Sequence, residues 1–295
     1  MVWFTEDRAE TRSEKNTSAN VSSLSEEISS FSAVVLTGGS SGIGKSFINL
    51  MRNQNAEPVV CNLSRRKPRE TGEINFAQKL NHFPCDLSRA AEVARVAGEV
   101  QAFLAEHVPT GRLLLVNNSG FGAYGEFPEP NLAHHLEMVD VNVRAVVHLT
   151  GLLLPLLKAR GGAIVTVASI AAFQPTPYMA TYGATKAFVL HWSLALNEEL
   201  RGTGVRTLAV CPGPTSTEFS VRAGLRPGSA PASLSMTSDA VAMAALRALA
   251  AGRAQVVPGW TNQISAFAAG RISKPQAARL GARVLVRFRA KKVSP

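Results

Sequence analysis

Short apolar runs alternate with helical patterns along most of this chain, and that alternation limits the folds open to it. The runs are rich in Val, Leu and Ile and cover residues 34–37, 57–64, 113–120, 163–169, 205–213 and 254–259. Strands separated by helices form parallel sheets with right-handed crossovers. Runs in which apolar and polar residues do not strictly alternate are typical of strands covered on both faces. The sequence therefore predicts an α/β fold, a doubly wound parallel sheet of about seven strands with helices on both faces.

A glycine-rich turn follows the first of these strands. Residues 31–44 read FSAVVLTGGSSGIG, and a helical pattern continues through Phe47, Ile48 and Met51. Backbone N–H groups at a helix N-terminus bind phosphate, and glycines let the backbone approach closely. A turn of this kind can also serve only to pack a helix on a strand, because its spacing departs from the usual dinucleotide fingerprint. The expected phosphate contacts are Gly38, Ser40, Ser41, Gly42, Ile43 and Gly44.

A tyrosine and a lysine four residues apart supply candidate chemistry. Tyr182 and Lys186 lie thirteen and seventeen residues after Ser169. On a helix they share one face, so the ammonium is expected to lower the proton affinity of the phenol. Such a tyrosine could act as a general acid near neutral pH.

Several segments together resemble the short-chain dehydrogenase/reductase family, in its order and at its spacing. They are Thr37 to Gly44, Asp86-Leu87, Asn117 to Gly120, Asn142, Ser169, Tyr182 with Lys186, and Cys211 to Thr215. The resemblance covers roughly residues 31 to 260 and implies a Rossmann-like, single-domain NAD(P)-dependent oxidoreductase.

The resemblance also implies roles for individual residues. Tyr182 would donate the proton to a substrate carbonyl, Ser169 would hydrogen-bond the same oxygen, and Lys186 would bind the nicotinamide ribose. Asn142 would hold a water that links Lys186 to solvent; the alternative is an amide that caps a helix kink. The remaining cofactor contacts would be Asp86 and Leu87 at the adenine, Asn118, Ser119 and Gly120 at the adenine ribose, and Pro212, Gly213 and Thr215 at the carboxamide.

Residues after the second strand indicate the choice of cofactor. An acidic residue that would bind a ribose 2′-hydroxyl is missing there, and Ser64, Arg65 and Arg66 stand in its place. A hydroxyl and guanidinium groups can receive the additional phosphate of NADP. A solvated basic loop is the alternative. We expect NADP(H), with Arg65 as the direct contact.

The substrate site is less sharply defined. Candidate walls are Phe121, Tyr124 and Phe127, the segment 173–179, and a loop at 215–236 that could close as a lid. Their apolar character predicts an apolar ketone or aldehyde, or the matching secondary alcohol. Tyr178 lacks a lysine four residues on and is interpreted as a packing or substrate-side aromatic.

Both ends of the chain differ in composition from its centre. We expect a disordered leader at 1–30, a catalytic domain at 31–262 and a basic helical extension at 263–295. The net charge is +10, and no acidic residue follows Asp239. The extension could contact a membrane through Leu280, Val284, Leu285 and Phe288, or pack on its own domain as a solvated basic helix. Nucleic acid is not expected, since the tail has no recognisable binding module.

No stretch reaches the roughly 20 apolar residues of a bilayer crossing, and the three cysteines show no metal or redox spacing. We therefore expect a cytoplasmic protein, and the resemblance implies a homodimer or homotetramer. Two other functions remain open: a noncatalytic NADPH-binding regulator or scaffold, and a membrane-surface reductase of lipid-like ketones.

Overall fold

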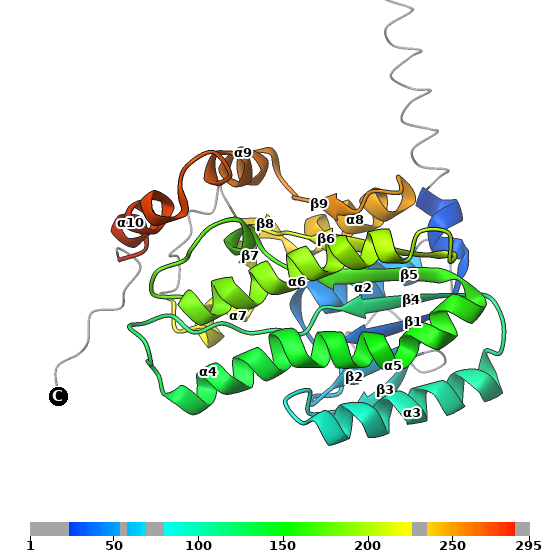
Figure 1. Ribbon diagram of the computed structural model, residues 1–295. Coiled ribbons are helices and arrows are strands. Elements are labelled where there is room, and N and C mark those ends of the chain that lie inside the picture. The colour runs from blue at the N-terminus through cyan, green and yellow to red at the C-terminus, as the bar shows by residue number, and fades with distance from the viewer. Residues whose placement is uncertain (1–23, 54–57, 69–79, 226–234, 287–295) are drawn as a thin grey trace, which may run out of the picture.

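The computed structural model describes residues 24–53, 58–68, 80–225 and 235–286. Its centre is a seven-stranded sheet in which every pairing is parallel, in the order β3-β2-β1-β4-β5-β6-β9 (Figure 1). The strands are β1 (Phe31–Thr37), β2 (Val59–Ser64), β3 (Leu80–Pro84), β4 (Arg112–Asn117), β5 (Gly162–Val167), β6 (Val205–Val210) and β9 (Gln255–Val256). The predicted doubly wound α/β fold is confirmed.

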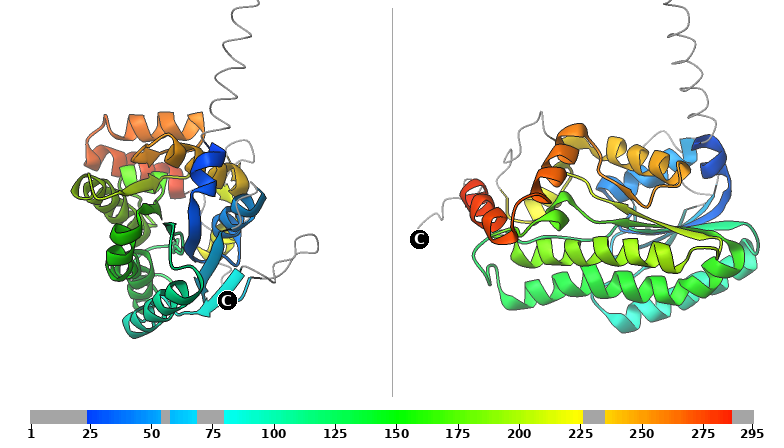
Figure 2. Two further views of the ribbon diagram at one scale, coloured as in Figure 1. Left: turned by 90° about the vertical axis from the view of Figure 1, so that its right-hand side faces the viewer. Right: turned by 45° about the horizontal axis from the view of Figure 1, so that its top comes forward.

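Helices cover both faces of this sheet (Figure 2). One face packs against α2 (Gly42–Asn53) and α8 (Ser238–Ala250), and the other against α3 (Ala90–His107), α5 (Ala145–Arg160) and α6 (Ala180–Glu199). Each face has its own apolar core, because side chains of one strand alternate between the two. Leu36 of β1, for example, belongs to the first core and Val35 to the second.

Six of the seven strands coincide with the apolar runs of the sequence. The seventh, β3, reads LNHFP and is only half-buried. It lies at the edge of the sheet and pairs on one side with β2. An edge strand needs less apolar surface, so no continuous run marks it.

The expected leader is wrong for its last residues. Residues 24–29 are helical, and Leu24 and Ile28 are buried in the core beside β1. Glu27 accepts ion pairs from Arg112 at 3.3 Å and from Arg206 at 2.7 Å. The ordered domain therefore begins before residue 31; the rest of the leader lies outside the described residues.

A long helical segment runs along one face of the sheet. It joins α4 (Leu132–Val139), a single π-helical turn η2 (Asp140–Arg144) and α5. By length and composition alone, Leu132–Arg160 would be long and apolar enough to cross a membrane, which the sequence analysis did not anticipate. In this fold α5 packs on α3 and on the sheet, which is the position of a core helix.

The described C-terminal residues contain two helices. They are α9 (Trp260–Ala269) and α10 (Lys274–Leu285), and α10 lies beyond the carboxyl ends of the strands (Figure 1). Two short strands, β7 (Thr215–Ser216) and β8 (Met236–Thr237), pair with each other. In the chain they lie between α6 and α8, and α7 (Phe219–Arg222) follows β7. The extension is therefore placed at the end of the sheet where the candidate site residues lie.

Candidate active site

One large cleft, of about 1210 Å³, opens at the carboxyl ends of the strands. Ligands bind at this edge in open α/β sheets. All the predicted site residues line the cleft except Gly44 and Asn142. Residues that are far apart in the chain thus line the same cleft.

Tyr182 lies at the floor of the cleft, on the first turn of α6, and is buried. Burial raises the pKa of its phenol to about 12, and a hydrogen bond with Ser169 opposes this rise. Ser169 is buried as well, at the start of a 3₁₀ turn, η3 (Ile170–Phe173), where its Oγ accepts from the Ala171 N–H at 3.1 Å. Ser169 Oγ also donates to the Pro212 carbonyl at 3.5 Å, so its hydroxyl is held by backbone groups on both sides.

Lys186 lies one helical turn after Tyr182 and is also buried. Its Nζ donates a hydrogen bond to the carbonyl oxygen of Val167 at 2.8 Å and lies 5.9 Å from the centre of the Tyr182 ring. Burial lowers the pKa of Lys186 to about 8. The ammonium therefore faces both the phenol and the end of β5.

The expected lowering of the Tyr182 pKa is wrong for the protein as described here. Withdrawal from water raises the pKa of a phenol, and the hydrogen bond with Ser169 only partly counteracts this. A phenol with a pKa of about 12 stays protonated near neutral pH, so its proton is available for transfer to an alkoxide.

Asn142 supports the cleft from behind. It sits in the π-helical turn η2, where its Nδ2 donates to the Phe121 carbonyl at 2.9 Å and to Thr185 Oγ1 at 3.1 Å. Its Oδ1 accepts from the Phe121 N–H at 3.1 Å. The side chain thus ties the segment after β4 to α6. A π turn in a helix is often found at a functional site.

The glycine turn is closely packed against the segment after β4. Gly38 has a φ of +73°, and a Cβ there would come within 2.6 Å of Ser119 Oγ. A Cβ at Gly44 would lie 2.4 Å from the Gly38 carbonyl oxygen. Asn118 Nδ2 holds the same turn by donating to the Thr37 carbonyl at 2.9 Å. Glycine is therefore required at both positions, because a side chain would collide with Ser119 or with the turn itself.

The basic segment after β2 reaches the other end of the cleft. Arg65 pairs with Glu137 at 3.5 Å, and Arg66 pairs with Glu218 at 3.1 Å. All four side chains are more than one-third exposed, so these ion pairs are weak and can be exchanged for another anion. The Ser64 hydroxyl is engaged differently, since it donates to the Arg66 carbonyl at 2.7 Å and accepts from Asn62 at 2.8 Å.

The acid after β3 is held by its own loop. Asp86 Oδ1 accepts from Ser88 N–H at 3.0 Å and from the Ser88 hydroxyl at 2.8 Å. Partial burial opposes ionisation, but these hydrogen bonds lower the pKa of Asp86. The carboxylate is therefore ionised at neutral pH and lines the cleft beside Leu87.

Helix α10 lines part of the cleft, a position that the sequence did not predict. The sequence left two alternatives for its apolar stripe, contact with a membrane or packing on its own domain, and in the structure Leu280, Val284 and Leu285 line the cleft. Lys274 Nζ donates to the Phe173 carbonyl at 2.7 Å, and the Tyr124 hydroxyl donates to the Leu285 carbonyl. Further apolar lining residues are Phe121, Met179, Phe219 and Leu225.

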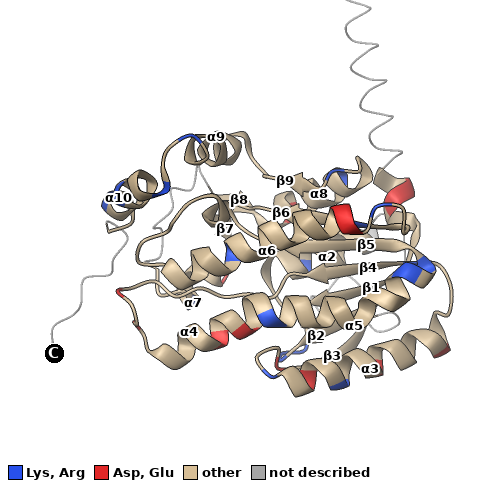
Figure 3. Cartoon of the chain, viewed as in Figure 1, with Lys and Arg blue, Asp and Glu red and all other residues tan. Residues whose placement is uncertain are grey.

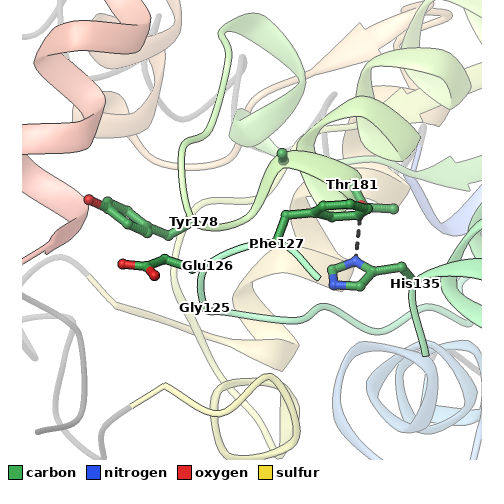
Figure 4. Close-up of a pocket in the computed structure, with 7 residues that line it drawn as sticks. Gly125, Glu126, Phe127, His135, Tyr178 and Thr181 are labelled. Carbon is green, nitrogen blue, oxygen red and sulfur yellow. Dashed lines mark hydrogen bonds between the residues drawn. The ribbon is translucent and has the colours of Figure 1, made fainter. Parts of the chain in front are cut away.

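Two of the predicted wall residues point elsewhere. Phe127 and Tyr178 border a second, smaller cavity of about 220 Å³, together with Gly125, His135 and Thr181 (Figure 4). His135 bridges this region, with Nδ1 3.0 Å from Thr181 Oγ1 and Nε2 2.8 Å from the Glu129 carbonyl. Tyr178 is therefore separate from the phenol of Tyr182.

Comparisons with known proteins agree with this geometry. The model of the family described as short chain dehydrogenase matches residues 32–226. Sulfoacetaldehyde reductase 2 from Chromohalobacter salexigens is 33% identical over 202 residues, which cover 65% of this chain and 76% of the relative. A short chain dehydrogenase from Burkholderia cenocepacia, solved with NADP, superposes with a TM-score of 0.68 at 26% identity over 90% of this chain and 99% of its own. One from Sphingobium yanoikuyae, solved with NADPH, gives 0.65 at 27% identity over 89% and 98%. The chain therefore belongs to the short chain dehydrogenase family of oxidoreductases.

Proposed function

We propose that this protein is an NADP(H)-dependent oxidoreductase that interconverts an apolar ketone or aldehyde and the matching alcohol. The observation that carries the proposal is the convergence of Tyr182, Ser169 and Lys186 on the floor of one cleft that also contains the glycine turn. The same set leaves the noncatalytic regulator or scaffold without a supporting observation.

The chain offers binding groups for each part of the cofactor. The glycine turn would hold the pyrophosphate, Asp86 the adenine, Lys186 the nicotinamide ribose, and Arg65 and Arg66 the 2′-phosphate. Support for NADP over NAD comes from these two guanidinium groups and from the NADP and NADPH bound in the two related structures. When bound, NADPH supplies the hydride that reduces the carbonyl carbon.

The protein's own residues handle the carbonyl oxygen and its proton. Ser169 Oγ–H would donate a hydrogen bond to that oxygen and fix its position. Tyr182 would transfer its phenolic proton to the developing alkoxide, which completes the alcohol. The ammonium of Lys186 would stabilise the phenolate that remains. Asn142 would hold a water that links Lys186 to solvent.

Support for an apolar substrate comes from the walls of the cleft. Its lining includes Phe121, Met179 and Phe219 together with Leu280 and Val284. Leu280 and Val284 are about half exposed, so a bound apolar group would remove their surface from water.

The test is a screen of carbonyl compounds that follows NADPH absorbance, with the Tyr182→Phe variant run beside the native protein. Oxidation of NADPH by an apolar ketone or aldehyde, absent in the variant, is the expected result. Turnover of NADH alone, or no turnover across short and long carbonyl compounds, would contradict the proposal.

The proposal includes a homodimer or homotetramer in the cytoplasm. Large apolar side chains are exposed along the long helices beside the sheet, at Leu132, Leu136, Val139, Val147 and Phe188. Such surface is typical of subunit interfaces. Sedimentation equilibrium checks the subunit number; a monomer at micromolar concentration would contradict it.

A further inference from the structure

Helix α9 exposes its large apolar side chains and buries its small ones. Asn262, Ala266 and Ala269 face the domain, and Asn262 and Ala269 are buried. Trp260, Ile264 and Phe267 are spaced by four and three residues on the outward side, where they are 73%, 58% and 63% exposed. We call these three residues the α9 face.

The inward side explains why small residues are needed there. A Cβ at Gly213 would come within 2.1 Å of Asn262 Oδ1, so the helix packs closely on the segment that follows β6. Asn262 Nδ2 also donates to the Pro258 carbonyl at 2.8 Å. The α9 face therefore adds nothing to the domain core, and its three large side chains remain exposed to solvent.

The chain segment that contains α9 and α10 carries charge of one sign. No Asp or Glu follows Asp239, and the described residues after α9 include Arg271, Lys274, Arg279 and Arg283. The guanidinium of Arg271 lies 4.3 Å from the centre of the Phe267 ring, which places a cation at the edge of the apolar surface. Figure 3 shows blue but no red on α10 and on its connection to α9.

This charge argues against a second copy of the chain as the partner. A symmetric dimer centred on α9 would bring Arg271 and its basic neighbours against the same residues of the other copy. Like charges at such an interface repel. An anionic partner that also accepts Trp, Ile and Phe is complementary to both features.

We propose that the α9 face docks this protein on an anionic lipid surface. Trp and Phe favour the boundary between headgroups and acyl chains, and nearby Arg and Lys are attracted to anionic headgroups. This docking surface is on α9 and differs from the apolar stripe of α10 that the sequence offered for membrane contact, because that stripe lines the cleft.

The docked orientation would place the active-site cleft near the lipid. Ile272, in the connection between α9 and α10, is exposed and lines the cleft, as do Leu280 and Val284. The docking proposal does not depend on the proposed reaction, since its test measures binding alone.

The test is sedimentation of the full chain with vesicles of phosphatidylcholine, with and without phosphatidylglycerol, at low and high salt. The native protein is expected to pellet with the anionic vesicles, and less so at high salt. The double variant Trp260→Ser/Phe267→Ser should bind about tenfold or more weakly. Ile264→Ser should also weaken binding, whereas Val221→Ser, which removes an equally exposed aliphatic side chain from α7, should not.

Unchanged thermal unfolding of the variants shows that the fold is intact, because the α9 face makes no core contact. The proposal would be overturned if the native protein did not pellet with the vesicles, or if the double variant pelleted as well as the native protein. It would also be overturned if the double variant lost self-association or binding to duplex DNA while its vesicle binding was unchanged.

Discussion

The Nζ of Lys186 lies 5.9 Å from the centre of the Tyr182 ring and is hydrogen-bonded to the end of β5. The backbone therefore holds the cation beside the phenol without a direct bond between the two side chains. This arrangement leaves the phenolic hydroxyl to Ser169 and to a substrate. It also separates the two roles, so that each can be tested by a different measurement.

Tyr182→Phe should lower kcat by about 10²- to 10⁴-fold while NADPH affinity changes little, because only the proton donor is removed. Steady-state rates and fluorescence titration with NADPH measure the two effects. Tyr178→Phe is the matched control, since that phenol borders the smaller cavity. Native-like turnover by the Tyr182 variant would refute its assignment as the acid.

Lys186→Met should change how stability depends on pH. The pKa of Lys186 is about 8 in the folded protein against an ordinary value of 10.5, so between these values the unfolded chain binds more protons. Stability contributed by this group therefore rises with pH across that window. The free energy of unfolding of the native protein, relative to the variant, should increase by about 3 kcal/mol from below pH 8 to above 10.5.

Urea unfolding at a series of pH values measures this difference. Lys158→Met, which removes an exposed lysine at the end of α5, is the control. A constant difference between native protein and the Lys186 variant would mean that the ammonium is not buried.

Arg65→Ala should weaken NADPH binding by about ten- to a hundredfold and NADH binding much less. The ion pair with Glu137 is exposed and long, so little is lost when Arg65 turns to a phosphate. Calorimetric titration with both nucleotides checks this. Arg201→Ala, which breaks the exposed pair with Glu198, is the control. Equal losses for the two nucleotides would refute the choice of NADP.

Ile28→Ala should destabilise the protein by about 2–5 kcal/mol, although residue 28 lies in a segment expected to be disordered. The side chain is fully buried between the sheet and α2. Chemical unfolding measures the change, and Ser29→Ala at the exposed neighbouring position should have little effect. A neutral Ile28 variant would show that this helix is not part of the folded core.

Leu280→Ser should raise KM for long apolar carbonyl compounds and leave short ones nearly unaffected. Its side chain lines the cleft away from the Tyr182 end of α6, on the separate helix α10. Gln276→Ser, at an exposed position of α10 that does not line the cleft, is the control. Equal effects on short and long substrates would indicate that α10 acts on the cleft as a whole and not as a wall for the apolar chain.

The sequence was sufficient for the parts of the site that are local in the chain. The strand, glycine turn and helix from residue 31 to 53, and the spacing of Tyr182 and Lys186, follow from backbone geometry and helical periodicity. Parallel topology then brings the ends of β1, β4, β5 and β6 to one edge of the sheet. The fold and the position of the cleft could therefore be predicted.

Contacts between distant segments could not be predicted from the sequence. An amphipathic pattern shows that a helix has an apolar stripe, but it does not say what covers that stripe. For this reason the sequence could not decide between a membrane and the domain itself as the contact of α10, which lines the cleft. For the same reason Leu24 and Ile28 were assigned to a leader, although they are part of the core. The raised pKa of Tyr182 has the same origin, since it depends on how much protein surrounds the phenol.

The sequence by itself thus determined the doubly wound sheet and the residues at its carboxyl edge, because repeated local patterns and chain order specify both. Only the tertiary structure decided which helix walls the cleft, which side of α9 faces water and how the charged groups are buried, because these depend on packing between segments that the sequence does not bring together.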